Sequence, residues 1–403
     1  MTRPPRNFSG GGWRVLASVF LLIWIGCAGL GPGTSGRTVL GIEGSRFILH
    51  GKPTFLLGFS YFGALGAPEE FIRKDLDDFQ RRKFNWLRVW ATWSAFGTDV
   101  SAVDGRGEIR EPFMGKLKLL VAECDRRGMV VDVTLTRGKE SSRKAAEGRV
   151  WDFESHRRAA IALVKELQGH RNWYLDLANE HDVRDERHVP NDELKKLREE
   201  VRRLDPRRLV TASYGGHDLS AEVIRECLVT IGLDFLCPHR PRNAESPGQT
   251  EAKTRWYLAT MKEIRRMAPV QYQEPFRRGY EEWQPKADDF SADLRGAEAG
   301  GGAGWCFHNG AERGAAEHRR PGSFDLHKQR LIEQLDEEER EFVGRQIPQI
   351  GERSSGTVRK WRGTTETVGQ ISCGPPGHRA RRRVNPQART PALRRLPGGF
   401  NRT

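Results

Sequence analysis

The chain has 403 residues, of which 37% are apolar and eleven are Trp, so it can form one large domain or two ordinary ones with a sizeable core. Its net charge of +14 suggests that the protein binds nucleic acid. The charge lies at the two ends, however: residues 1–38 hold four Arg and no acid, and residues 351–403 hold eleven Arg and one Lys against two Glu. The stretch 39–350 is therefore neutral overall, which argues against nucleic-acid binding.

The N-terminus has the pattern of an export signal. Three Arg within the first 14 positions precede an apolar run at 15–25 and then small residues, and the run is shorter than the ~20 residues that span a bilayer. We predict a signal peptide over residues 1–28 and an extracytoplasmic protein, secreted or periplasmic. Two alternatives stay open. Residues 24–27 resemble a bacterial lipobox, so Cys27 could carry a lipid anchor, and the segment could also be an uncleaved anchor helix.

From about residue 54 to residue 350 the chain alternates short apolar runs with amphipathic stretches. The runs predict strands and the amphipathic stretches predict helices. In chain order, strands are expected at 55–60, 85–91, 130–135, 173–178, 209–213, 233–237, 270–273 and 304–307. Helices are expected at 68–82, 114–127, 156–168, 192–204, 220–227, 251–267, 287–299 and 326–343.

Eight strand–helix pairs within ~300 residues predict the α/β class and a closed (β/α)8 TIM barrel. No glycine-rich nucleotide fingerprint follows the first strand, which argues against an open doubly wound sheet. We place the barrel domain at residues 39–350. Ahead of its first strand, residues 46–54 have the pattern of a hairpin with its turn at His50-Gly51, which would cover the lower barrel mouth.

The C-terminal stretch 351–403 is rich in Arg, Gly, Pro and Thr and nearly free of aliphatic periodicity. Such a composition does not bury enough apolar surface to offset the entropy of ordering, so we predict a disordered basic tail. Its Arg-rich run at 379–383 could bind anionic surfaces. Alternatively the tail has no evolved role, because a shifted reading frame or a misassigned stop yields the same composition.

The cysteines and histidines give little support for a metal site. The chain contains six Cys but no CxxC pair, and no His/Asp cluster has metal-ligand spacing, so we predict no metal and no cofactor. The compartment permits one disulfide. For the four cysteines of the barrel, single buried thiols are nevertheless the expectation. These four are Cys124, Cys227, Cys237 and Cys306.

Two glutamates stand at predicted strand ends, where barrels of this type carry their catalytic groups. The fourth strand ends Ala-Asn-Glu at 178–180, and the seventh ends Gln-Glu at 273–274. Glycosidic cleavage needs such a pair, one acid to protonate the leaving oxygen and one carboxylate to attack the sugar carbon. Strands four and seven face each other across the barrel mouth, so the ~5–5.5 Å separation of a retaining enzyme is within reach.

Together with Trp-Leu-Arg-Val at 86–89, these motifs resemble the clan A glycoside hydrolases, especially the family 5 cellulases and mannanases, over about residues 40–345. The resemblance implies a retaining hydrolase of a β-linked glycan, of glucan or mannan type, that acts by double displacement without a cofactor. Glu180 would be the acid/base, with a pKa raised by the negative charge of the nucleophile Glu274. Arg88 would keep that nucleophile ionised.

The resemblance also implies substrate-binding residues. Asn179 would hold the sugar 2-hydroxyl, and Trp305 would form the platform under the reacting sugar. Trp93, in a predicted upper loop, would line the cleft by stacking. His239 matches the family's His after the sixth strand, but the nearby Tyr that orients the nucleophile is missing. Three residues could take the place of that Tyr: Tyr214, Tyr272 and His217.

Two further departures from the family pattern concern the fourth and third strands. His181 stands where the family has Pro, and the strand at 130–135 lacks the family's His. Two other hypotheses therefore stay open: a catalytically impaired barrel that binds carbohydrate, and an unrelated barrel enzyme that uses Glu180 and Glu274 for proton abstraction. For the leading hypothesis, the expected partner is a polysaccharide or oligosaccharide, and the expected state is a monomer.

Overall fold

The structure, a computed structural model, describes residues 37–138, 148–279, 282–308 and 324–347. All of them lie in Met1–Thr357, the first of the two units into which the chain divides. The predicted signal peptide at 1–28 and the predicted basic tail at 351–403 lie outside the described residues. Across the part that is described, no helix is both long enough and apolar enough to cross a membrane.

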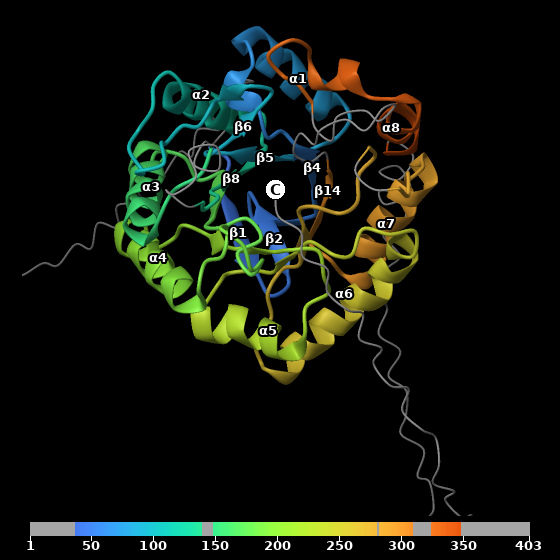
Figure 1. Cartoon of the computed structure of the whole chain (residues 1–403). Helices are drawn as coiled ribbons and strands as arrows, with labels where there is room; N and C mark the ends of the chain where they lie inside the picture. Colours follow the sequence, from blue (N-terminus) through green and yellow to red (C-terminus); the bar gives the residue numbers. More distant parts are fainter. Residues whose placement is uncertain (1–36, 139–147, 280–281, 309–323, 348–403) are drawn as a thin grey trace, which may run out of the picture. The chain divides into compact units, whose positions relative to one another are not determined.

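The central strands form a closed parallel barrel, as the sequence predicts (Figure 1). The strands are β4 (Leu56–Ser60), β5 (Trp86–Trp90), β8 (Val130–Thr134), β9 (Trp173–Asp176), β10 (Val210–Thr211), β11 (Ser213–Tyr214), β12 (Cys237–Pro238), β13 (Gln271–Tyr272) and β14 (Gly304–Phe307). Seven of them pair in the order β10-β9-β8-β5-β4-β14-β13. β11 continues β10 and pairs with β12, and a bridge between Leu236 and Val270 closes the ring.

Among the described residues, eight α-helices surround the strands, and Figure 1 shows them as a ring around the barrel. They are α1 (Glu69–Arg81), α2 (Phe113–Arg126), α3 (Phe153–Glu166), α4 (Asn191–Leu204), α5 (Ala221–Arg225), α6 (Ser246–Glu263), α7 (Ala287–Gly300) and α8 (Glu337–Glu341). Local signals set their ends. The Asp152 carboxylate accepts from Ser155 N (2.8 Å) to start α3, and Gly301, with φ of 90°, ends α7.

The prediction of one continuous last helix at 326–343 is wrong, because this segment forms several short helical turns instead. It forms a 3-10 turn (Leu331–Gln334) and then α8, and the π-helical turn Phe342–Gln346 follows. Arg330 donates from Nε to Asp75 Oδ1 of α1 (3.0 Å). The Asp336 side chain then caps α8 by accepting from Glu339 N (3.0 Å). This pairing with α1 and the internal cap override the helical periodicity of the sequence.

The predicted hairpin is confirmed, with one more strand than expected. β1 (Leu40–Glu43), β2 (Arg46–Leu49) and β3 (Lys52–Thr54) form an antiparallel sheet. His50 and Gly51 make the turn with φ of 50° and 75°, the positive values that a tight two-residue hairpin needs. The fully buried Phe47 packs edge-on against Phe235 (ring centroids 5.0 Å apart) in a cluster with the first residues of β4, β5 and β8.

Side chains alternate along the strands between two environments. One set faces the helices and forms the large apolar core. The other set faces the barrel axis, and it includes the buried charged residues Arg88, Asp132 and Asp176, which bond to one another from β5, β8 and β9. The four barrel cysteines are buried free thiols, as predicted. A polar axis of this kind positions the groups above it, and those groups form the site described next.

Candidate active site

Glu180 and Glu274 lie at the same end of the barrel, one after β9 and one after β13. Glu180 adopts a left-handed backbone conformation (φ 47°), and its N–H donates to Ser213 Oγ of β11 (3.1 Å). Such a φ is rare for a residue with a side chain and is found mainly at turns and functional sites. Both glutamates are nearly buried, with 12% and 6% of their side chains exposed.

His239, directly after β12, lies between the two glutamates. Its Nδ1 donates to Glu180 Oε1 (3.1 Å) and lies 3.6 Å from Glu274 Oε2. One oxygen of each carboxylate and one nitrogen of this ring all lie within 4.8 Å of one another. The predicted substrate-binding residue His239 is thus in contact with the predicted catalytic pair.

Arg88, on β5, holds Glu274 from below and is fully buried. One guanidinium nitrogen donates to Glu274 Oε1, and the other donates to Asp176 Oδ2 (2.9 Å) and Asn179 Oδ1 (3.0 Å). Burial raises the pKa of Glu274, but the charges of His239, Arg88 and Arg242 lower it by more than burial raises it. The net shift of this pKa is therefore downward. The expectation that Arg88 helps to keep Glu274 ionised is consistent with this arrangement.

A second layer of hydrogen bonds supports Arg88. Asp132 Oδ2 lies 3.4 Å from Arg88 Nε, and it accepts from Tyr174 Oη (3.0 Å) and Gln273 Nε2 (2.5 Å). Burial and the negative charge of Asp176 raise the pKa of Asp132 to about 8 against the pull of Arg88. The raised pKa favours the protonated form of this carboxyl, which leaves fewer negative charges around one guanidinium.

Two further arginines contact Glu180 from the upper loops. Arg187 Nη1 donates to Glu180 Oε2 (2.6 Å), and Arg242 Nη2 lies 3.3 Å from Glu180 Oε1 and 3.0 Å from Glu274 Oε2. Burial raises the pKa of Glu180, but His239, Arg242 and Arg187 together lower it well below its usual range. The prediction of a raised pKa is therefore wrong for this structure, because it considered the charge of Glu274 and left out the contacts of Glu180 with His239 and the two arginines.

Within the described residues, Glu180, His239 and Glu274 are also the group whose ligand atoms lie close enough to hold a metal ion. Arg242 bears on this possibility, since its guanidinium already bridges the two carboxylates. A divalent cation in the same position would be repelled by that charge. The arrangement thus resembles an ion-paired carboxylate dyad, and the prediction of no metal stays a prediction.

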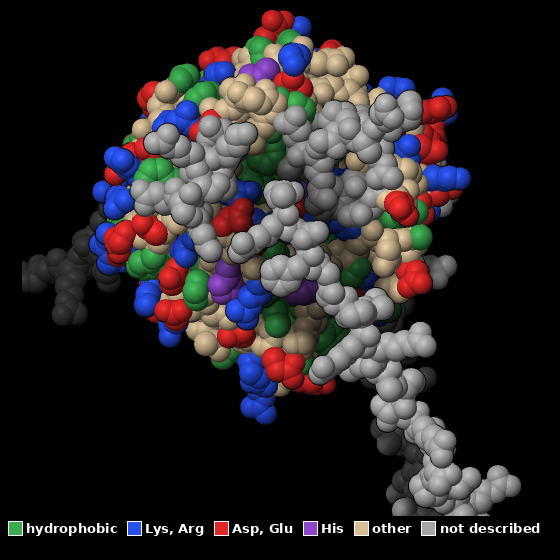
Figure 2. Space-filling model, in the orientation of Figure 1, with side chains coloured by type: hydrophobic (Ala, Val, Ile, Leu, Met, Phe, Trp, Pro, Cys, Tyr) green, Lys and Arg blue, Asp and Glu red, His purple; other side chains and the backbone are tan. Residues whose placement is uncertain are grey.

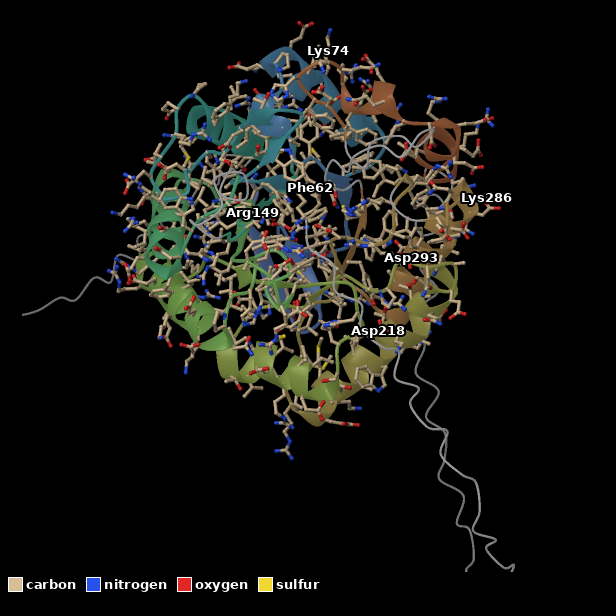
Figure 3. The ribbon with its side chains drawn as sticks, viewed as in Figure 1. Phe62, Lys74, Arg149, Asp218, Lys286 and Asp293 are labelled. Carbon is tan, nitrogen blue, oxygen red and sulfur yellow. The ribbon has the colours of Figure 1, made fainter. Side chains whose placement is uncertain are left out.

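The platform prediction for Trp305 is wrong. Its side chain is fully buried on the helix side of β14, where Nε1 donates to Asp293 Oδ2 of α7 (2.7 Å). Figure 3 labels Asp293 at α7, away from the centre of the ring, whereas Phe62 lies near the centre. The inward residue at this strand end is His308, whose Nε2 lies 3.5 Å from Glu274 Oε2.

Tyr214 does not reach Glu274 either. Its ring packs edge-on against His181 (4.3 Å) and its hydroxyl points toward Cys227, on the helix side of β11. The other two candidates also point elsewhere, because Tyr272 Oη bonds to Thr254 (2.6 Å) and His217 pairs with Asp182 (2.8 Å). His239 and Arg242 contact Glu274 instead.

Trp93 lies beside the site in an aromatic cluster. Its ring packs on Phe62 and Trp90, with both centroids 5.1 Å away, and 7% of its surface is exposed. Phe62 in turn lies 5.8 Å from the His308 ring. The aromatic cluster presents little exposed ring surface to a ligand. Stacking of Trp93 on a sugar stays a prediction.

Sequence reasoning missed Arg187, Arg242 and His308. Arg187 and Arg242 lie in loops, where an Arg has no pattern that separates it from a solvated surface charge. His308 follows β14 with the inward parity of Cys306, and this was a readable signal. His308 accepts from Arg277 Nη1 at Nε2 (2.6 Å) and contacts Ser60 Oγ through Nδ1 (3.0 Å), and burial lowers its pKa well below the usual range. It is therefore a neutral ring.

No family profile and no curated protein matches this sequence, but its fold matches solved structures. An endo-1,4-β-mannanase from Rhizomucor miehei superposes with a TM-score of 0.51 at 13% identity, over 66% of this chain and 89% of that one. A family 5 glycoside hydrolase from Bacteroides vulgatus gives 0.52 at 15% identity, over 71% and 67%. The fold is that of the family 5 glycoside hydrolases.

A β-1,4-mannanase from Cryptopygus antarcticus has the same glycoside hydrolase fold, with a TM-score of 0.50 at 13% identity over 68% of this chain and 90% of that one. The resemblance to the clan A enzymes is therefore confirmed at the level of the fold. At such identities a shared fold does not carry a shared reaction. The reaction has to be argued from the glutamate pair and its neighbours.

Proposed function

We propose that the protein is a retaining hydrolase of a β-linked glycan, with Glu274 as the nucleophile and Glu180 as the acid/base. One observation carries the proposal: two carboxylates from facing strand ends have oxygens within 4.8 Å of each other, and a buried Arg holds one of them. This close approach of the nearest oxygens favours retention, because inverting enzymes hold their carboxyl groups ~6.5–9.5 Å apart to admit a water between them.

The reaction would proceed in two displacements. In the first, Glu274 attacks the anomeric carbon, the bond to the leaving oxygen breaks, and Glu180 gives that oxygen a proton. In the second, Glu180 takes a proton from water, whose oxygen attacks the same carbon and frees Glu274. The sum is one glycosidic bond and one water converted into two hydroxyl groups, with no cofactor.

Asn179 fits the role of holding the sugar 2-hydroxyl. Its Oδ1 accepts from Arg88 Nη2 (3.0 Å), so the amide nitrogen is the group left to donate toward a substrate. A bond of this kind strengthens as positive charge develops on the sugar ring. For the glycan itself we propose a β-1,4-linked backbone of the glucan or mannan type, since the solved structures of this fold named above include two β-1,4-mannanases.

The assignment can be tested with aryl β-glycosides. We expect Glu274→Gln to abolish turnover, and Glu180→Ala to be slowed most on substrates with poor leaving groups. Azide should rescue Glu180→Ala and yield a β-glycosyl azide, which reports retention. As a matched control, Glu251→Gln on the exposed face of α6 should keep wild-type rates. Near-normal turnover by Glu274→Gln would exclude the mechanism, and glycan binding without turnover by the wild type would indicate a binding protein.

We also propose that the protein is a monomer and that it is exported, with cleavage near residue 28, lipidation at Cys27 or retention of the segment as an anchor. The basis for export is the apolar run at the N-terminus and the Arg residues that precede it. Cell fractionation, with mass spectrometry of the mature N-terminus, separates cleavage, lipidation and retention of an anchor. An intact N-terminus on protein recovered only from the cytoplasm would contradict export.

A further inference from the structure

Arg242 occupies the space in which the reaction would take place. Its Nη2 lies 3.0 Å from Glu274 Oε2 and 3.3 Å from Glu180 Oε1, so it bridges the two carboxylates. Its Nε donates to the carbonyl of Pro275 (3.2 Å), and only 13% of its side chain is exposed. A glycosidic oxygen that bonds to Glu180 while its sugar carbon faces Glu274 needs this same space.

Substrate binding must therefore move Arg242. A neutral sugar would displace the guanidinium from both carboxylates and offer it no charge in return. Breaking these largely buried ion pairs without replacing them is costly. A sugar with its own negative charge would replace what the guanidinium loses.

The acid role of Glu180 leads to the same requirement. Arg187, His239 and Arg242 surround this carboxylate and favour its ionised form, yet the first displacement needs it protonated. Transfer of Arg242 to another anion would remove one of these cations. Glu180 would then take up a proton from solvent once the substrate is bound.

We propose that the substrate is an acidic β-glycan, an inference that rests on the function proposed above. The sugar at the cleavage point would bear a carboxylate or a sulfate ester, and this anion would bind Arg242 in place of the two glutamates. Arginine suits this exchange, because its fork binds a planar carboxylate through two parallel bonds.

The surroundings favour an ionic ligand over one held by stacking. Arg187, Arg242 and Arg277 all come from loops at this end of the barrel and contact Glu180, Glu274 or His308. Basic and histidine side chains lie close to acidic ones around the middle of the face in Figure 2. By contrast, Trp305 is in the core, and the aromatic cluster beside the site is nearly buried.

The decisive comparison uses glycans that differ only at C6. The pairs are β-1,4-polyglucuronate with β-1,4-glucan and β-1,4-polymannuronate with β-1,4-mannan, and a 6-O-sulfated glucan forms the sulfate arm. We expect kcat/KM for one acidic member to exceed that of its neutral partner by about 10- to 100-fold, the range of one charge-assisted hydrogen bond. Arg242→Gln should remove most of this preference, whereas Arg255→Gln, an exposed Arg on α6, should keep it.

The outcomes separate the two proposals. If a neutral member is cleaved as fast as its acidic partner in every pair, the acidic substrate is excluded while the hydrolase stands. An unchanged preference in Arg242→Gln excludes the role of Arg242. If no glycan or aryl glycoside of either kind is cleaved, the hydrolase fails and the acidic substrate fails with it. Faster cleavage of the sulfated glucan than of either uronate supports the proposal and selects the sulfate ester.

Discussion

Replacing Asp132 with Asn should flatten the pH dependence of stability between about pH 4 and pH 8. Asp132 is fully buried beneath Glu274, and it shares Arg88 with Asp176 and Glu274. Burial and the charge of Asp176 raise the pKa of Asp132 to about 8, from an ordinary 3.8. Asn has nearly the same shape and carries no charge in either state.

The size of the effect follows from that shift. Between the two pKa values the folded protein binds one proton more than the unfolded chain does, so its stability falls as the pH rises. The contribution is fully present below the unfolded pKa and is lost as the pH passes through the folded one. One proton corresponds to about 1.4 kcal/mol per pH unit, or roughly 6 kcal/mol across the whole window.

Urea unfolding followed by Trp fluorescence at several pH values between 4 and 8 measures this slope. We expect the free energy of unfolding of the wild type to fall more steeply than that of Asp132→Asn. Asp192→Asn, at an exposed position of α4 where Lys196 lowers the pKa of the carboxylate, should keep the wild-type slope. Equal slopes in the wild type and Asp132→Asn would refute the assignment of the proton to Asp132.

Three other substitutions test the fold and the site. Trp305→Phe should cost about 1–3 kcal/mol in urea unfolding, because the Asp293 carboxylate loses a donor, and should leave KM unchanged; a large rise in KM would restore the platform role. Phe47→Ala should lower the free energy of unfolding by about 3–5 kcal/mol in the same assay, since it leaves a cavity between the β1–β3 sheet and the barrel where Phe47 packs on Phe235. Arg88→Lys should lower kcat/KM about 100-fold in aryl glycoside assays, because an ammonium cannot reproduce the fork that holds Glu274; a rate near wild type would contradict this.

The barrel could be predicted because its strands are buried on both sides. Such strands appear as short apolar runs, and the run at 304–307 matches β14 at both ends. The last helix could not be found in this way, since its periodicity competes with the tertiary pairing of Arg330 with Asp75. Local pattern decides an element when no distant charge pair opposes it.

Within the site, strand-end position identified the glutamates, but strand parity was needed for the rest. Cys306 faces the barrel axis and Trp305 faces α7, so the inward residue above Cys306 is His308. The same alternation turns Ser213 inward and Tyr214 outward. The side-chain period of two in a strand was available from the sequence, and applying it would have corrected both assignments.

The loop arginines were beyond sequence reasoning for another reason. Arg187 and Arg242 lie seven and 62 positions from Glu180, and only the folded loops bring them to it. No periodicity marks a loop side chain, so neither cation could be predicted to contact Glu180. The pKa direction expected for Glu180 was wrong because these two cations add to the effect of His239. The charge around Glu180 thus depends in part on loop geometry, which its position at a strand end does not reveal.

The lowered pKa of Glu180 predicts how kcat/KM on neutral aryl glycosides depends on pH. The alkaline limb of kcat/KM reports loss of the proton from the acid in the free enzyme. Because His239, Arg242 and Arg187 favour ionised Glu180, this limb should lie at acidic pH. Arg187 contributes through a direct bond to Glu180 Oε2 (2.6 Å), and it keeps a second partner in Asp185 (2.8 Å).

Arg187→Gln should move that limb to higher pH, because removing a cation raises the pKa of the neighbouring carboxyl. The acidic limb, set by Glu274, should shift less, since Arg88 and Arg242 hold that carboxylate. Arg149→Gln removes a rim arginine that pairs with Glu186 (2.7 Å), so its profile should coincide with the wild type. An alkaline limb unmoved in Arg187→Gln would mean that Arg187 does not set the protonation of Glu180. A shift of equal size in Arg149→Gln would trace the effect to the general charge of the rim, which falls off with salt, whereas the direct bond is screened much less.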